Sequence, residues 1–257
     1  MYTLGIDIGS TTSKCAVIKD GKELVAHSLQ TGGLGTGGPE EAMAQLWQSC
    51  GLIRQDMACA FVTGYGRKNY EGADGEISEL TAHALGGRFV FPDLRTVIDI
   101  GGQDAKVIAL SPSGKMVNFV MNDKCAAGTG RFLDVMASIL RLDVDALDTE
   151  AAKATAPAAI SSTCTVFAES EVISQLANGV KRPDLVAGIC RSVASRVAAL
   201  ARRAGVTERV CLSGGVAQND AVRQALSDEL NVPVSVDPLA QYFGAIGAAL
   251  WAYKQQV

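Results

Sequence analysis

A short sequence that occurs twice in the chain constrains the fold most strongly. Ile6-Asp7-Ile8-Gly9 recurs as Ile98-Asp99-Ile100-Gly101, and each copy follows an apolar run typical of a buried strand. A lysine lies five residues after each glycine, at Lys14 and Lys106, and a second apolar run continues from it. Strand, glycine turn and strand, used twice with the same flanking pattern, predict an α/β protein built from two related lobes.

The repeated turns have the composition of a phosphate site. Glycine lets backbone N–H groups approach a phosphate closely, and an aspartate just before each turn suits hydrated Mg²⁺. We therefore expect the two turns to hold a polyphosphate from two sides. The alternative, a pair of ordinary β-hairpins, would rarely repeat the aspartate. Small hydroxyl side chains add donors in the first turn, at Ser10, Thr11, Thr12 and Ser13.

Two further glycine clusters precede predicted helices, at Leu212–Asn219 and Phe243–Ala249. Helix N-termini flanked by glycine can accept phosphate or let a flat ring lie against the backbone. A purely structural turn or close helix packing would give the same pattern. The repeated turns lie between strands, which excludes a dinucleotide-binding helix opening, and the chain has no Gly-rich loop of the Walker type.

Composition narrows the class of partner. The chain has 257 residues, 48% of them hydrophobic and 19% charged, with a net charge of −4. This is a globular composition without a basic stripe, so nucleic acid is not an expected partner. The apolar segment Tyr2–Ile8 predicts a first strand rather than a signal peptide, and no apolar run has membrane-spanning length. We expect a cytoplasmic protein that does not enter a membrane.

The order of predicted elements gives the domain boundaries. Strands are expected at 2–8, 15–19, 24–28, 57–63, 96–100, 106–110, 116–121, 210–212 and 234–236. Helices are expected at 39–50, 79–86 and 132–142, in a mostly helical stretch to 203, and after the glycine clusters. We predict an N-terminal lobe over residues 1–95, completed by a C-terminal helix at 243–257. Residues 96–242 would form the second lobe, with a nucleotide cleft between the two.

Two of the seven cysteines stand apart from the others. Cys15, Cys190 and Cys211 lie in apolar patterns and are expected to be buried, whereas Cys125 and Cys164 lie among small and polar residues near predicted helix starts. A helix N-terminus favours the thiolate, and thiolates bind soft metals and iron–sulfur clusters. Two cysteines cannot complete a four-thiolate site, but a symmetric dimer could supply four. The alternative is two unrelated loop cysteines.

These segments together resemble a known family. The chain is similar, over essentially its whole length, to the activator ATPases of 2-hydroxyacyl-CoA dehydratases, a group that includes the ATPase subunits of benzoyl-CoA reductase. The resemblance implies a duplicated actin-like, ribonuclease H-like fold of the acetate kinase, actin and Hsp70 superfamily. The motifs that carry it are the first turn over 6–14, the second over 99–106, the cysteine segments 122–130 and 164–171, and the glycine clusters at 214–216 and 244–248.

The same resemblance implies a function. Family members are homodimers with one [4Fe–4S] cluster at the interface, bound by two cysteines from each subunit, which match Cys125 and Cys164. ATP hydrolysis rearranges the helices at the cluster. A single electron then passes from a ferredoxin or flavodoxin, through the cluster, to an iron–sulfur dehydratase or reductase.

The roles implied for individual residues follow the motifs. Asp7 and Asp99 would order Mg²⁺ and its waters, while Gln103 and Asp104 would position or deprotonate the attacking water. The phosphates would lie against the two turns, at Ser10, Thr11, Thr12, Ser13, Lys14, Gly101 and Gly102. The nucleoside would lie near Gly214, Gly215, Gln218 and Gln241.

Two other functions stay open at this point. A small-molecule kinase of the same superfamily, of the sugar type, would need a carbohydrate pocket in the first lobe, and the chain has no obvious insertion for one. A non-catalytic, nucleotide-dependent scaffold is the second alternative. The sequence does not name the downstream enzyme or its substrate.

Overall fold

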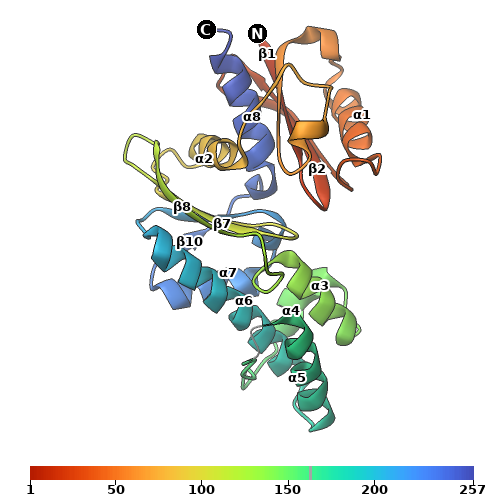
Figure 1. The fold of residues 1–257 in the computed structure, drawn as a ribbon, viewed down its shortest axis with the longest axis vertical. Coiled ribbons are helices and arrows are strands. Elements are labelled where there is room, and N and C mark those ends of the chain that lie inside the picture. Colours follow the sequence, from red (N-terminus) through yellow and green to blue (C-terminus); the bar gives the residue numbers. More distant parts are fainter. Residues whose placement is uncertain (162–163) are drawn as a thin grey trace. The chain divides into compact units, whose positions relative to one another are not determined.

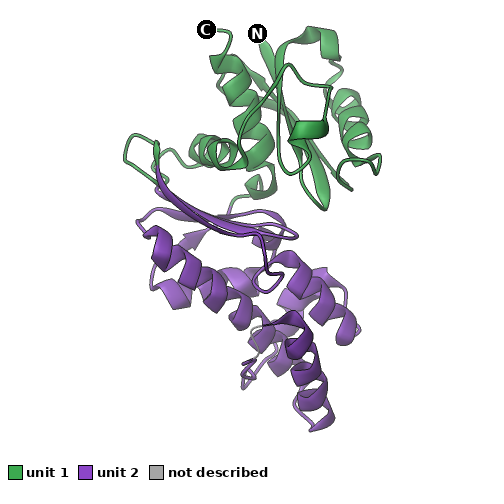
Figure 2. Cartoon of the chain, in the orientation of Figure 1, with its two compact units in different colours: residues 1–94, 110–116, 237–257 green, residues 95–109, 117–236 purple. Residues whose placement is uncertain are grey.

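The computed structural model describes residues 1–161 and 164–257 (Figure 1). It divides into two compact units (Figure 2). Unit 1 comprises residues 1–94, 110–116 and 237–257, and unit 2 comprises residues 95–109 and 117–236. Segment 110–116 is the tip of a hairpin that belongs otherwise to the sheet of unit 2.

Unit 1 is a five-stranded sheet with helices on both faces. The strand order is β3-β2-β1-β4-β5, with β1, β2 and β3 antiparallel and β4 and β5 parallel to β1. The strands are β1 (Tyr2–Ile8), β2 (Thr12–Lys19), β3 (Glu23–Thr31), β4 (Met57–Thr63) and β5 (Gly75–Glu76). The helices are α1 (Gly38–Cys50), α2 (Glu79–Val90) and α8 (Phe243–Lys254), with short 3-10 turns at Arg54–Asp56, Arg67–Asn69 and Ala240–Tyr242.

The alternation of side chains along β2 explains the two layers. Cys15 and Val17 face a core that includes Ala42 and Leu46 of α1. Their neighbours Ala16 and Ile18 pack instead with residues of α8, among them Ala245, Ile246 and Ala249. Successive side chains of a strand point to opposite faces, so a continuously apolar strand requires a helix on each side.

Unit 2 repeats this topology. Its strand order is β10-β9-β6-β7-β8, with β6 and β7 antiparallel and β9 and β10 parallel to β6. The strands are β6 (Thr96–Ile100), β7 (Ala105–Leu110), β8 (Met116–Asn122), β9 (Val210–Ser213) and β10 (Val234–Ser235). The helices are α3 (Gly130–Ile139), α4 (Leu147–Ala151), α5 (Thr165–Ala177), α6 (Arg182–Ala204) and α7 (Asp220–Leu230). Further 3-10 turns lie at Val144–Ala146 and Gly215–Gln218.

The strand registers confirm the duplication. Asp7 of β1 lies opposite Lys14 of β2, and Asp99 of β6 lies opposite Lys106 of β7. The central strand of each sheet also has a parallel neighbour that ends at the same level, β4 in unit 1 and β9 in unit 2. The two turns therefore occupy equivalent positions in two sheets of the same topology.

The largest difference from the predicted elements lies after β9. The sequence predicts a helix that opens directly at the glycine pair, but a 3-10 turn over Gly215–Gln218 comes first. The side chain of Asn219 then accepts a hydrogen bond from the N–H of Val222 and caps α7. Asparagine is among the strongest N-caps, so the helix begins after it.

Among the described residues, no helix combines the length and apolar character that a membrane span requires.

Contact between α2 and α8 depends on glycine. A Cβ at Gly86 of α2 would overlap the carbonyl oxygen of Phe243, and one at Gly247 of α8 would overlap that of Ala82. The two helices therefore meet backbone to backbone, with no room for a methyl group at either position.

We predict that Gly247→Ala destabilises the protein, although alanine favours an isolated helix by about 1 kcal/mol. Overpacking should lower the free energy of unfolding by about 1–3 kcal/mol, measured by urea denaturation. Lys254→Ala, at the exposed end of the same helix, is the control and should change stability little. Unchanged or increased stability of Gly247→Ala would show that the helices can separate without cost.

Candidate functional site

The first glycine turn places a buried carboxylate beside a helix start. Gly9 N–H donates to Thr12 O at 3.0 Å and closes the turn. Lys14 Nζ lies 3.5 Å from Asp7 Oδ2, and both side chains are largely buried. A Cβ at Gly244 would lie 2.6 Å from the same oxygen, so glycine at the N-terminus of α8 admits the carboxylate. A helix N-terminus stabilises a negative charge, which offsets the burial of Asp7.

The second turn is closed by an equivalent backbone hydrogen bond, and its lysine pairs with two carboxylates instead of one. Gly101 N–H donates to Asp104 O at 2.9 Å. Lys106 Nζ lies 3.3 Å from Asp99 Oδ2 and 2.7 Å from Asp104 Oδ2. Ser213 Oγ donates to Asp99 Oδ1 at 2.7 Å. The Asp104 carboxylate is 27% exposed and is thus the one of the two that solvent reaches readily.

The parallel neighbours of the repeated strands add a second pair of equivalent positions. Thr63-Gly64 ends β4 beside Asp7, as Ser213-Gly214 ends β9 beside Asp99. Gly64 has a φ of 90° and Gly214 a φ of 84°, and a Cβ at either would overlap a carbonyl oxygen of the adjacent strand. Thr63 Oγ1 is buried and has no hydrogen-bond partner among the described residues.

Sequence reasoning did not assign Thr63, Gly64 or Ser213 to the site. The available signal was a hydroxyl residue followed by glycine at the end of an apolar strand, present once in each half of the chain. That signal becomes specific only when the parallel pairing of the strands is known.

The other predicted nucleotide residues divide between the units. Ser10 and Thr12 are half-buried and Thr11 is exposed in the first turn, whereas Ser13 is buried and its Oγ donates to Gly32 O at 2.7 Å. In unit 2, Gly101 and Gly102 are half-buried in the second turn and Gln103 is exposed there. Gly215 and Gln218 are exposed in the 3-10 turn after β9. Gln241 lies in unit 1, in the 3-10 turn before α8.

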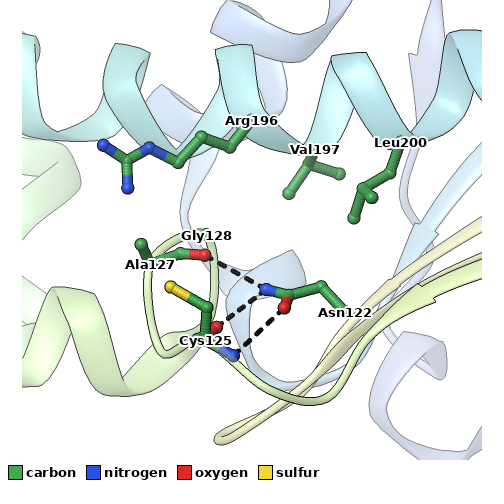
Figure 3. A pocket seen from close by; sticks show the side chains of 7 residues that line it. All are labelled: Asn122, Cys125, Ala127, Gly128, Arg196, Val197 and Leu200. Carbon is green, nitrogen blue, oxygen red and sulfur yellow. Dashed lines mark hydrogen bonds between the residues drawn. The ribbon is translucent and has the colours of Figure 1, made fainter. Parts of the chain in front are cut away.

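Cys125 lies in an exposed loop that its own hydrogen bonds hold in shape. Asn122 Nδ2 donates to Cys125 O at 2.7 Å and to Ala127 O at 3.2 Å (Figure 3). Cys125 N–H donates back to Asn122 Oδ1 at 3.2 Å, and Thr129 Oγ1 donates to Ala126 O at 2.7 Å. The thiol is thus presented on an ordered loop although it is exposed to solvent.

Cys164 is the N-cap residue of α5 and is also exposed. The other five cysteines differ: Cys50 is half-buried and four are buried. Burial raises the pKa of the Cys15 and Cys190 thiols to about 12, as expected where a thiolate would be desolvated. Cys125 and Cys164 are therefore the two fully exposed cysteines of this chain. The predicted burial of Cys15, Cys190 and Cys211 is confirmed.

The start of α3 is bonded to the second turn rather than directed at Cys125. Gly130 N–H donates to Gly101 O at 2.9 Å, and Arg131 N–H donates to Gly102 O at 2.8 Å. These two N–H groups of α3 therefore donate to the second turn and not to Cys125. Instead, two hydrogen bonds join the glycine turn to the helix that follows the cysteine loop.

A single chain offers an incomplete metal site. No group of three or more His, Cys, Asp or Glu side chains among the described residues is arranged to hold a metal ion. Two exposed thiols on neighbouring elements suit a soft metal or iron–sulfur centre, provided that further thiolates come from another chain. The donor chemistry therefore fits a shared cluster and not a site within one subunit.

Comparisons with known proteins show which proteins the chain resembles. Over 256 residues the chain is 57% identical to the (R)-2-hydroxyglutaryl-CoA dehydratase activating ATPase of Acidaminococcus fermentans, covering 99% of this chain and 98% of the relative. It superimposes with a TM-score of 0.96 on the activator of 2-hydroxyisocaproyl-CoA dehydratase from Clostridium difficile with bound ADPNP. That protein is 51% identical, with 99% and 95% of the two chains covered.

More distant structures show the fold class. A ROK family glucokinase from Streptomyces griseus matches with a TM-score of 0.59 at 15% identity, covering 99% of this chain and all of the kinase chain. The predicted duplicated α/β fold of the actin-like ATPase class is thus confirmed. The profile of one family, named for the BadF, BadG, BcrA and BcrD ATPases, matches residues 4–252. Since this match spans nearly the whole chain, the protein belongs to the BadF/BadG/BcrA/BcrD ATPase family.

Proposed function

We propose that this protein hydrolyses ATP to drive single-electron transfer to a partner iron–sulfur enzyme of the 2-hydroxyacyl-CoA dehydratase type. The electron would pass through a [4Fe–4S] cluster shared by two copies of the chain. The observation that carries the proposal is the link between a glycine turn and α3, the helix that follows an exposed cysteine. Two relatives named as dehydratase activators, one of them with bound ADPNP, support it.

The turns supply the nucleotide chemistry. Backbone N–H groups near Ser10 and Thr11 and near Gly102, together with Lys14, would bind phosphate oxygens. Asp7 and Asp99 would hold waters of Mg²⁺, which when bound neutralises phosphate charge. Asp104, which is partly exposed and pairs with Lys106, would accept a proton from an attacking water beside Gln103.

The exposed cysteines supply the redox chemistry. Cys125 and Cys164 would each donate a thiolate, and a bound [4Fe–4S] cluster would accept one electron and pass it on. Two ligands per chain require a second copy, because an isologous dimer doubles every donor on its axis. A ferredoxin or flavodoxin is the class of donor that delivers single electrons to such a centre.

An unpartnered face of α5 supports the dimer. Only Ala168 and Val172 of this 13-residue helix are buried. Val166, Phe167 and Ile173 are 66%, 68% and 50% exposed and lie within the three turns that follow Cys164. Solvent-exposed apolar side chains grouped in this way mark an interaction surface. A second copy that covers α5 would bring its own Cys164 to the same place.

Coupling between ATP hydrolysis and the cluster would depend on contacts within unit 2. Gly101 and Gly102 accept hydrogen bonds from the first N–H groups of α3 and would also bind phosphate. A change of the turn between ATP and ADP states would therefore shift α3 and the Cys125 loop. Hydrolysis can alter the reducing power of an electron only if the two nucleotide states place the cluster in different surroundings.

Removal of either exposed cysteine should abolish the cluster. We expect Cys125→Ser and Cys164→Ser, purified without oxygen, to lose the iron and the brown absorption of the wild type while still binding ATP. Cys50→Ser, which changes a half-buried thiol of α1, is the control and should keep its iron. Normal iron content in either exposed-cysteine variant would refute the ligand assignment, and colourless wild-type protein would favour a kinase or scaffold.

Removal of the partly exposed carboxylate should separate binding from hydrolysis. Asp104→Asn should lower the rate of ATP hydrolysis at least about 100-fold, because the amide cannot accept the proton. Nucleotide affinity should change much less. Asp145→Asn removes an exposed carboxylate of the same unit and serves as the control. Wild-type turnover in Asp104→Asn would exclude this residue as the base.

A charge on α5 should weaken the dimer. Phe167→Glu would bury a carboxylate in an apolar interface and should weaken self-association at least about tenfold, measured by analytical ultracentrifugation under argon. Gln224→Glu adds a charge on the exposed face of α7 and should leave the dimer intact. Identical sedimentation of Phe167→Glu and wild type would show that α5 is not the interface.

A further inference from the structure

Arg196 of α6 lies across a pocket from Cys125, and the proposed function does not use it. We infer that Arg196 is a tuning residue for the cluster: a fixed positive charge that raises the reduction potential of the centre held by Cys125 and Cys164. The inference rests on the proposed function. It adds one residue, on a different helix from either cysteine, to the determinants of electron transfer.

The pocket places loop and helix face to face. It encloses about 240 Å³ between the cysteine loop and α6. Cys125 and Asn122 line it from the loop, and Arg196, Val197 and Leu200 line it from the helix. The Cys125 side chain points from the loop toward the helix (Figure 3). Because Val197 and Leu200 are apolar, the guanidinium is the charged group on the helix side of this pocket.

A cation–π contact restrains the Arg196 side chain. Its Cζ lies 5.5 Å from the centroid of the Phe132 ring, and Phe132 is a buried residue of α3. Such cation–π contacts restrain a guanidinium in addition to stabilising it. The loop also lies against α6 at Gly128, whose φ is 86°: a Cβ there would be in ordinary van der Waals contact with Arg196, 3.4 Å from its Cβ. The charge is therefore fixed relative to the loop and does not move freely in solvent.

Both exposed cysteines contribute to the electrostatic surroundings of Arg196. Burial lowers the pKa of the Arg196 guanidinium, and charge interactions with Cys125 and Cys164 act in the opposite direction. Both sulfur atoms are thus within electrostatic range of one cation. A guanidinium keeps its proton in proteins, so the site carries a permanent charge.

Other nearby charges are less effective. The N–H groups of Gly130 and Arg131 at the start of α3 are bonded to the second turn, so they do not face the cluster ligands. Lys124, next to Cys125 in the chain, is 89% exposed and pairs with Asp123. Solvent and salt screen an exposed charge strongly and a half-buried one much less. Arg196 is therefore the cation best placed to influence the cysteines from within the fold.

The effect of Arg196 on the reduction potential follows from the charge of the reduced cluster. When the donor gives one electron to the cluster, the centre becomes more negative by one unit, and no bond forms or breaks. A nearby positive charge stabilises that reduced form and raises the potential. Arg196 would thereby keep the centre reducible by a ferredoxin- or flavodoxin-class donor. Without Arg196, the reduced cluster would be a stronger reductant, but the donor would reduce it less readily.

The test compares three variants of the intact dimer. Arg196→Gln removes the charge, Arg196→Lys keeps it, and Arg203→Gln removes an exposed charge seven residues further along α6. That residue lies about 10 Å further along the helix axis, close to the Debye length in physiological salt. Iron content is measured first. Each protein is then titrated without oxygen against redox mediators, and the reduced cluster is followed by its EPR signal.

We expect all three variants to bind as much iron as the wild type. At a fixed ambient potential, Arg196→Gln should show a ratio of reduced to oxidised cluster about tenfold lower, a shift of about 59 mV for a one-electron couple. Arg196→Lys and Arg203→Gln should titrate within a small fraction of that shift from the wild type.

Three results would overturn the inference. These are an unchanged midpoint in Arg196→Gln, an equal shift in Arg203→Gln, and loss of iron from both Arg196 variants, which would make the residue structural. Absence of iron from the wild type would instead contradict the proposed function itself. Failure of the inference and failure of the proposed function are thus distinguishable.

Discussion

The structure depends on a carboxylate buried at the end of a central strand. Desolvation of an aspartate is costly unless opposite charge and hydrogen bonds compensate for it. In unit 1, Asp7 has Lys14 across the strand pair and the start of α8 beside it. In unit 2, Asp99 has Lys106 and the hydroxyl of Ser213. Each arrangement lies at the base of a glycine turn, which is a predicted phosphate site.

The second turn differs from the first in what it is attached to. Its carbonyl groups accept the first N–H groups of α3, so the turn, the helix and the Cys125 loop are consecutive parts of one hydrogen-bonded assembly. Phe132 of the same helix contacts Arg196 of α6. The predicted phosphate turn and the two exposed thiols therefore belong to the same unit. Unit 1 contains the first turn but no exposed cysteine.

Local patterns were sufficient for the regular elements. β1, β4 and β6 have the predicted bounds, because each is a compact apolar run limited by glycine or polar residues. The repeated aspartate and lysine were visible in the sequence, but their pairing across each hairpin, Asp7 with Lys14 and Asp99 with Lys106, was seen only in the structure. The two exposed cysteines were separable from the buried ones by the polarity of their neighbours.

Features that arise from long-range packing could not be predicted. Ser213 joins the Asp99 site only through parallel pairing of strands more than 100 residues apart in the chain. Arg196 is one of several arginines on α6, and only the fold shows which of them faces the cysteine loop. The hydrogen bonds between the start of α3 and the second turn are likewise a tertiary contact that the sequence does not indicate. The described residues end at 161 and resume at 164, so Ser162 and Thr163 of the second cysteine segment lie outside them.

The central claim is that two chains share one iron–sulfur centre through exposed thiolates. The most direct measurement is the ratio of iron to protein, determined together with molecular mass on wild-type protein purified under argon. The account predicts a dimer with one [4Fe–4S] cluster for every two chains. A dimer free of iron, or a monomer that retains a complete cluster, would contradict it.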